Sequence, residues 1–147
     1  MKTPGTRTND AARFVLFPLG KKRFAFPASM VTEFAGQDEP HYFPHTSPLV
    51  TGVLLRRGRI VPVADIAPML VGPGAPQRKF YLIATRATVK GPESTAIPVT
   101  GECELADSEL LPVQGELPPY VCGLLALQDE IVEVIDLERL MNAEVHA

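Results

Sequence analysis

The chain of 147 residues carries 14 basic and 17 acidic side chains, which gives a formal net charge of −3. This length fits one domain or two small lobes that stabilise each other, because a lone lobe of about 60 to 70 residues buries only a marginal core. The balanced charge provides no electrostatic drive toward nucleic acid, and no apolar run approaches the roughly 18 residues of a membrane span, so we expect a cytoplasmic protein without direct membrane insertion.

Short runs rich in Val, Ile, Leu and Phe predict that the chain is almost entirely β-strand. Turn residues separate these runs, and many short strands joined by hairpins are typical of small barrels. Several prolines (Pro18, Pro62, Pro98) fall inside the runs, and we expect them at edges, bulges or corners because proline donates no ladder hydrogen bond. The predicted strands cover residues 14–19, 23–26, 50–55, 60–65, 80–85, 95–99, 121–127 and 131–136, with hairpin tips at 20–22, 56–59 and 128–130.

A short helix is predicted after each of two aspartates, Asp65 and Asp136. Each carboxylate is well placed as an N-cap, where it accepts hydrogen bonds from the free amides of the first helical turn. Pro68 limits the first helix, and the second helix can continue to about Asn142.

The second half of the chain repeats the first. Shifted by 71 positions, residues 24–70 align with residues 95–141 without a gap, and 12 of the 47 pairs are identical, against roughly three expected by chance. Such a repeat predicts two similar units that share a core, with a groove between two like surfaces that suits a binding role. It leaves open whether the first strand is shared between the units. The expected lobes are residues 20–72 and 78–142 of one domain at 13–142, between a disordered tail at 1–12 and a tail at 143–147.

Asp65 and Asp136 are the best catalytic candidates, because two carboxylates related by a pseudo-twofold axis can share a proton as an acid/base dyad. Their flanks, Ala-Asp-Ile and Ile-Asp-Leu, lack the glycine loops that present such a pair to a substrate, and helix capping accounts for both residues. The chain also lacks a Gly-rich phosphate loop and a nucleophile elbow. We therefore expect no catalytic residue and no cofactor.

Metal binding is not expected either. His41 and His45 have a metal-like spacing, but Pro44 lies between them and no third His or Cys is near. Cys103 and Cys122 lie in strand-like segments, where a cytosolic thiol is usually a small buried hydrophobic side chain.

Recognition chemistry is concentrated in the tip Arg56-Arg57-Gly58-Arg59. Three guanidinium groups on one turn suit bidentate contact with carboxylates, although solvation is the favoured interpretation for Arg56 and Arg59. Glu33, in an otherwise apolar segment, is the natural counter-charge for one of the arginines. A surface pair of this kind contributes only about 0 to 1 kcal/mol, so we expect it to orient a contact surface.

At these residues the chain resembles the CheW-like adaptors of bacterial chemotaxis. The family pattern Gly-Val-Ile-Asn-Leu-Arg-Gly, followed by Ile-Val-Pro-Ile-x-Asp, is similar to residues 52–58 and 60–65. The upstream Val-x-Glu segment is similar to Val31-Thr32-Glu33, and the C-terminal part is similar to residues 123–140. The resemblance covers about residues 13–141.

This resemblance implies a mostly β fold with two SH3-like five-stranded β-barrel subdomains related by internal pseudo-symmetry, and no catalytic centre. It also implies a scaffold that couples chemoreceptors to a histidine kinase. One surface would bind the kinase regulatory domain, and the groove between the barrels would take the cytoplasmic tip of the receptor. The positions associated with these contacts, together with the neighbouring arginine of the tip, are Val31, Glu33, Gly52, Arg56 and Arg57.

Two alternatives remain open. Leu55 and Arg56 replace the family's Asn and Leu, which is compatible with a diverged adaptor of a pilus-motility or other chemosensory pathway, or one that has lost a partner. A small-barrel nucleic-acid-binding module would instead need exposed aromatic side chains beside a basic face, whereas Phe14, Phe17 and Phe24 lie in core-like runs.

Overall fold

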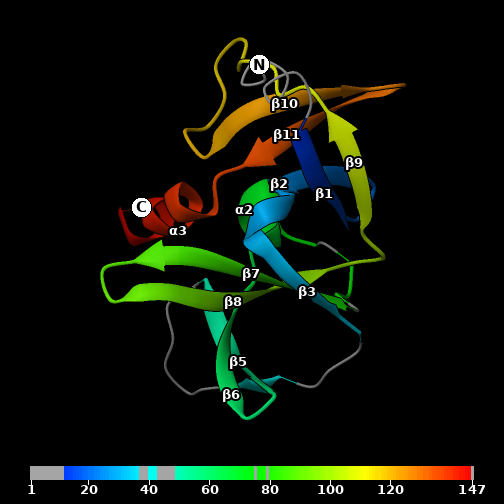
Figure 1. The fold of residues 1–147 in the computed structure, drawn as a ribbon. Coiled ribbons are helices and arrows are strands. Elements are labelled where there is room, and N and C mark those ends of the chain that lie inside the picture. The colour runs from blue at the N-terminus through cyan, green and yellow to red at the C-terminus, as the bar shows by residue number, and fades with distance from the viewer. Residues whose placement is uncertain (1–11, 37–39, 43–48, 75, 79, 147) are drawn as a thin grey trace, which may run out of the picture.

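The computed structural model describes residues 12–36, 40–42, 49–74, 76–78 and 80–146, and its elements are mostly strands. The strands form a five-stranded sheet A in the order β10-β11-β2-β1-β9 and a six-stranded sheet B in the order β3-β7-β8-β6-β5-β4. Figure 1 shows sheet A above sheet B, with helices α2 and α3 between them. The predicted fold class, a mostly β protein of two barrel-like subdomains, is confirmed. Sheet B has one strand more than expected.

Each predicted strand is present, with ends that differ by a few residues, and the hairpin tips lie where the turn residues placed them. The strands of sheet A are β1 (Ala12–Leu19), β2 (Lys22–Pro27), β9 (Glu104–Ser108), β10 (Val121–Leu127) and β11 (Glu130–Ile135). Those of sheet B are β3 (Val31–Ala35), β4 (His41–Tyr42), β5 (Val50–Arg56), β6 (Arg59–Ala64), β7 (Phe80–Thr88) and β8 (Gly91–Val99). The helical segments are η1 (Ala28–Met30), α2 (Ala67–Val71) and α3 (Leu137–His146).

Three strands, β3, β4 and β9, were not expected from the apolar runs. All three lie at the ends of the sheet orders, where a strand has one hydrogen-bonded neighbour and one open side. In β3 and β9 polar residues interrupt the apolar ones, as in Val31-Thr32-Glu33-Phe34-Ala35, and exposed positions recur along both strands. A half-exposed edge strand therefore escapes a search for continuous apolar runs.

The two sheets exchange hairpins between the halves of the chain. In sheet A, β2 of the first half pairs in parallel with β11 of the second half, through Val134 opposite Ala25. In sheet B, β8 of the second half pairs in parallel with β6 of the first half, through Val63 opposite Ala96. These two register pairs are equivalent under the 71-residue shift. The predicted contiguous lobes, residues 20–72 and 78–142, are therefore wrong in this respect: each barrel combines the first hairpin of one repeat with the later strands of the other.

The core follows from this exchange, because both hairpins are buried on their two faces. Alternate residues of β1 and β2 point into barrel A or toward the other barrel, and β7 and β8 do the same from barrel B. Phe17 lies at the centre of the shared layer, stacked on Phe26 with 4.7 Å between ring centroids and 6.0 Å from Phe24. The barrel interiors are smaller, and their members include Phe14, Leu16, Leu125 and Val132 in A and Leu54, Val61, Val63 and Ile83 in B.

The helix starts differ between the repeats. Asp136 is the N-cap of α3 as predicted, since its carboxylate accepts the amide of Arg139 at 3.1 Å. The prediction for Asp65 is correct only in part: Ile66 occupies the N-cap of α2, but the Asp65 carboxylate accepts the amide of Ala67, the first helical residue, at 3.4 Å. Arg78 of the connector also binds this carboxylate through two nitrogens, at 3.2 and 2.6 Å. The α3 helix also continues to His146, beyond the expected end near Asn142.

Of the places expected for Pro62 and Pro98, edges, bulges or corners, the structure excludes the edge strands. They lie on β6 and β8, the central strands of sheet B. The ladder between these two strands consists of a single register pair, so a missing amide hydrogen costs little there. The predicted N-terminal tail falls almost entirely outside the described residues, since residues 1–11 are not described, whereas residues 143–146 of the predicted C-terminal tail belong to α3.

We predict that Gly123→Ala destabilises the protein by about 1 to 3 kcal/mol, because overpacking at a tight site has costs of this size. A Cβ atom at Gly123 would lie 2.4 Å from Cδ1 of Leu110 and 3.0 Å from the carbonyl oxygen of Leu111. Urea denaturation measures the change, and Gly36→Ala is the control because nothing lies within 4 Å of the new methyl group. Equal stability of the two variants would contradict the steric argument.

We predict a single unfolding transition in calorimetry, with equal calorimetric and van't Hoff enthalpies, because neither barrel is complete without a hairpin from the other repeat. Phe24→Ala, in the shared layer, should lower the midpoint without splitting the transition. Two resolved transitions would show that the barrels unfold independently.

Candidate functional site

The arginine tip is a two-residue hairpin turn between β5 and β6. Arg56 pairs with Arg59 across the strands, and the central residues Arg57 and Gly58 have φ values of 52° and 77°. Positive φ at both central positions is the type I′ geometry, whose twist matches that of the flanking strands. Gly58 tolerates this conformation freely, whereas Arg57 is forced outward into solvent, with 81% of its side chain exposed.

Glu33 lies at the centre of the charged cluster. Its carboxylate forms a close ion pair with Arg56 and a longer one with Arg57, 3.7 Å from Nη2. The Glu33 and Arg56 side chains are each about one quarter exposed. The ion pair joins β3 to β5 at the place where barrel B closes. The favoured interpretation of Arg56 as a solvated residue is therefore wrong. Arg56 is the last residue of its strand and lies against Glu33, whereas Arg57 belongs to the turn.

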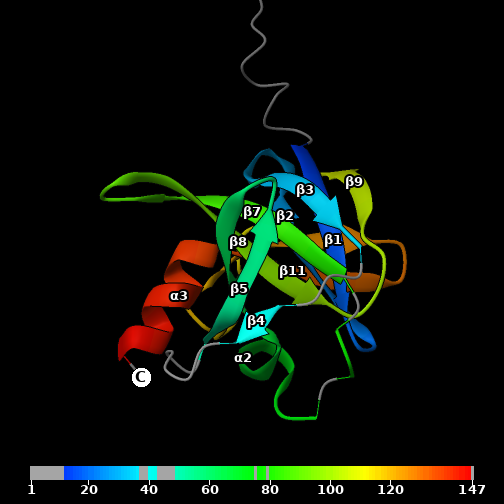
Figure 2. The ribbon, with the colours of Figure 1, turned by 90° about the horizontal axis from the view of Figure 1, so that it is seen from below.

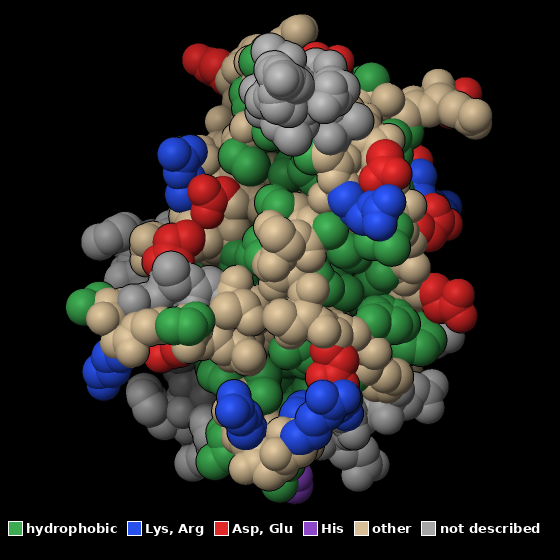
Figure 3. Space-filling view, viewed as in Figure 1, with side chains coloured by type: hydrophobic (Ala, Val, Ile, Leu, Met, Phe, Trp, Pro, Cys, Tyr) green, Lys and Arg blue, Asp and Glu red, His purple; other side chains and the backbone are tan. Residues whose placement is uncertain are grey.

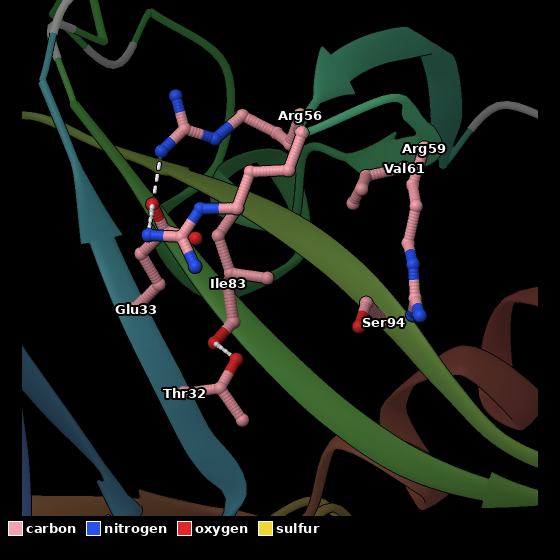
Figure 4. Close-up of a pocket in the computed structure, with 8 residues that line it drawn as sticks. Thr32, Glu33, Arg56, Arg59, Val61, Ile83 and Ser94 are labelled. Atoms are coloured by element: carbon pink, nitrogen blue, oxygen red, sulfur yellow. Dashed lines mark hydrogen bonds and ion pairs between the residues drawn. The ribbon is translucent and has the colours of Figure 1, made fainter.

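These side chains surround a pocket of about 440 Å³ at the mouth of barrel B, hereafter the mouth pocket. Figure 4 shows Arg56 reaching across the pocket to Glu33, and Arg59 extending along the other side toward Ser94. Val61 and Ile83, two members of the barrel interior, also line it. The mouth pocket therefore combines an apolar floor with a charged rim.

A second pocket, of about 330 Å³, lies between the barrels and is hereafter the inter-barrel groove. The edge strands β3 and β9 contribute most of its lining, including Val31 and Glu33. Phe34 and Leu105 are 42% and 65% exposed beside it, and Figure 3 shows hydrophobic surface between the two sheets on this face. Because β3 lines both pockets, Thr32 and Glu33 belong to both.

Gly52 is the predicted site residue that the structure places elsewhere. It is buried on β5, opposite Tyr42 of β4 and next to an irregularity in the register with β6. It lines neither the mouth pocket nor the inter-barrel groove. Its equivalent Gly123 lies at a matching irregularity between β10 and β11, so both glycines serve the local shape of the sheet.

The remaining chemical candidates separate in the fold. Asp65 binds Arg78, while Asp136 caps α3 and contacts Arg139, so the two carboxylates have different partners and do not form the dyad considered above. Within the described residues no cluster of three His, Cys, Asp or Glu side chains could hold a metal, and His45 is outside that range.

Both cysteines are free thiols. Cys103 packs against the shared core, and burial raises its pKa to about 12. Cys122 is exposed, in contrast to the expectation of a buried side chain, because it lies on the outer face of β10. Partial burial of the Cys122 sulfur is the larger cause that raises the pKa of this thiol, and the charge of Asp136 is the next. Neither thiol has the lowered pKa of a nucleophile.

Sequence reasoning missed the residues that complete the two pockets. Ile83 and Ser94 come from the exchanged β7–β8 hairpin, and Leu105 comes from β9. One signal was available: Glu33 and Ala35 are identical to Glu104 and Ala106 under the repeat, which marks β3 and β9 as equivalent.

Among the described residues, no helix combines the length and the apolar character that a membrane span requires.

Comparison with known proteins agrees with this architecture. A search of curated proteins found no match. Among solved structures, the chain is similar to the scaffolding protein TtCheW from Thermoanaerobacter tengcongensis, with a TM-score of 0.68 and 20% sequence identity over 88% of this chain and 91% of that one. At this identity the match shows the fold. The model of the CheW-like domain family matches residues 13–145, nearly the whole sequence, and the chain therefore belongs to the CheW-like domain family.

Proposed function

We propose that the protein is a non-enzymatic adaptor that couples chemoreceptors to a chemotaxis-type histidine kinase. Family membership supports a scaffolding role. The observation that carries the proposal is the arrangement of two differently lined pockets on either side of β3, one charged and one largely apolar. A single rigid strand between two binding surfaces suits a protein that holds two partners in register.

The two surfaces suit different partners. The mouth pocket, with Glu33, Arg56 and Arg57 on its rim, is proposed to bind the regulatory domain of the kinase, since exposed charges select a partner by complementarity. The inter-barrel groove, with Val31 in its lining, is proposed to take the helical tip of the receptor, whose apolar side chains would cover Phe34 and Leu105. Gly52 would act indirectly, by setting the path of β5.

We further propose a cytoplasmic location, with recruitment to receptor arrays through the partners alone. An output other than flagellar motility, such as pilus motility, is the second candidate. Its support is Leu55, which is 60% exposed next to the arginine tip and replaces the family's polar residue there. Nucleic-acid binding finds no support, because Phe14, Phe17, Phe24 and Phe26 are all buried. The exposed Phe34 lies in a pocket lined by Glu33 and Glu104 and not by basic residues.

Arg57→Glu should weaken binding of the kinase regulatory domain by about tenfold or more, since a repulsive charge replaces an attractive one at the rim. The thermal midpoint should stay nearly unchanged because the side chain is exposed. Calorimetric titration measures the affinity. Lys21→Glu, at the exposed β1–β2 turn, makes the same charge change and should bind like the parent. Equal affinities for all three proteins would refute the assignment of this surface.

Leu105→Glu should weaken binding of a receptor-tip fragment while leaving kinase-domain binding intact, because it places a charge beside the apolar inter-barrel groove. Ile131→Glu is the matched control, since Ile131 is 59% exposed and lies on β11 in the same sheet. Surface plasmon resonance with each immobilised fragment separates the two effects. Loss of kinase binding together with receptor binding in Leu105→Glu would argue against two separate surfaces.

A further inference from the structure

The two barrel mouths are equivalent under the repeat but differ in charge. Glu33 of barrel B corresponds to Glu104 of barrel A, and both repeats keep this glutamate. Two further positions of the mouths differ between the repeats: Ser94 corresponds to Arg23, and Arg59 corresponds to Glu130. The mouth of barrel A therefore shows which side chains can fill the equivalent space in barrel B.

In barrel A the mouth is closed by Arg23. Its guanidinium donates from Nη1 to Glu104 at 3.1 Å and from Nε to Glu130 at 3.1 Å, with a further close contact from Nη2 to Glu130. One cation is therefore held between two carboxylates that come from β9 and β11, which joins the strands around the barrel end. All three side chains find their partners within the chain.

In barrel B the corresponding space is open. Ser94 is too short to fill the place of Arg23, and the charge at position 59 is reversed relative to Glu130. The mouth pocket holds three arginines, Arg56, Arg57 and Arg59, against the single carboxylate of Glu33, a net charge of +2. Arg56 and Arg57 both pair with Glu33. In the described part of the chain no acidic side chain pairs with Arg59, whose guanidinium lies near Ser94 at the rim (Figure 4).

We infer that the mouth pocket accepts the carboxylate of an acidic side chain from a protein partner, held by Arg59 beside Ser94. This carboxylate would supply the second acidic group that barrel A provides from its own chain. The inference rests on the proposed function and deepens it, because it states which chemical group of the partner enters the site. The apolar floor of Val61 and Ile83 would contact the methylene groups of the entering side chain.

A protein carboxylate fits this pocket better than a nucleic-acid phosphate. The chain has a net charge of −3, and Glu33 inside the pocket would repel a continuous phosphate backbone. A single acidic side chain can enter on the Arg59 side. Arginine also binds carboxylates in a bidentate geometry, which a partner's Asp or Glu can satisfy with both oxygens.

The test is an NMR titration of the full-length ¹⁵N-labelled protein with the blocked peptide Ac-Glu-Glu-Glu-Glu-NH₂ at 50 and 500 mM NaCl. We expect shifts centred on the amides of Gly58, Arg59 and Ser94 at low salt, and their loss at high salt because the pair is partly exposed. The peptide Ac-Gln-Gln-Gln-Gln-NH₂ should leave these amides unshifted. Arg59→Gln should weaken binding of the acidic peptide about fivefold or more, the size expected for the loss of one charge-assisted contact. Lys21→Gln removes the same charge and should leave peptide binding unchanged.

A second test fills the mouth pocket instead of removing a contact from it, and its double variant is hereafter the reconstruction variant. Arg59→Glu combined with Ser94→Arg should transfer the Arg23–Glu130 pair of barrel A to the equivalent positions of barrel B, keep the thermal midpoint within a few degrees of the parent, and abolish binding of the acidic peptide. Equal peptide binding by the parent and Arg59→Gln, or shifts centred outside the mouth pocket, would overturn the inference. Stronger binding of a single-stranded oligonucleotide than of the peptide at these amides would also overturn it.

The outcome is separable from that of the proposed function. Peptide binding at the mouth pocket without any binding of the kinase regulatory domain would support the carboxylate site and count against the adaptor role. Kinase-domain binding that is unchanged by Arg59→Gln and by the reconstruction variant would support the adaptor role and overturn the carboxylate site.

Discussion

The fold depends on the burial of two hairpins, β1–β2 and β7–β8, on both of their faces. One face of each hairpin completes a barrel, and the other packs against the opposite hairpin around Phe17, Phe24 and Phe26. Figure 2, viewed from below, shows the β7–β8 pair crossing in front of the β1–β2 pair. Because each hairpin belongs to the barrel of the other repeat, neither half of the chain has a complete core of its own.

This exchange also positions the functional surfaces. The strands left at the sheet ends, β3 and β9, flank the inter-barrel groove, and β3 continues to the mouth of barrel B. The Glu33–Arg56 pair lies at that mouth, whereas Arg23, Glu104 and Glu130 close the other. Two barrels with the same strand order therefore present different chemistry: one mouth is filled by an arginine paired with two carboxylates, and the other keeps an excess of positive charge. Duplication supplied the shared frame, and substitutions at positions such as 59 and 94 made the surfaces unlike.

Much of the fold was predictable, because it rests on local signals. The apolar runs and turns located the strands of both hairpins, and the Asp136 cap marked the start of α3. The edge strands escaped detection because polar residues interrupt their apolar ones. Within the site, Glu33 and the arginine tip were identified, but Arg56 was assigned to solvent because its neighbour Glu33 lies 23 positions away in the chain. The exposure of Cys122 and the pairing of Asp65 with Arg78 were missed because burial and pairing depend on the tertiary structure.

The sequence alone determined that the chain contains two equivalent β units, where its turns and helices begin, and which charged residues differ between the repeats, since these are properties of local pattern and of the 71-residue shift. Only the tertiary structure decided which hairpin completes which barrel, because both repeats carry compatible strands, such as Ala25 and Ala96 facing Val134 and Val63. A sequence records which strands can pair. The choice among equivalent pairings is made by packing, which here favours the arrangement that buries both faces of each hairpin.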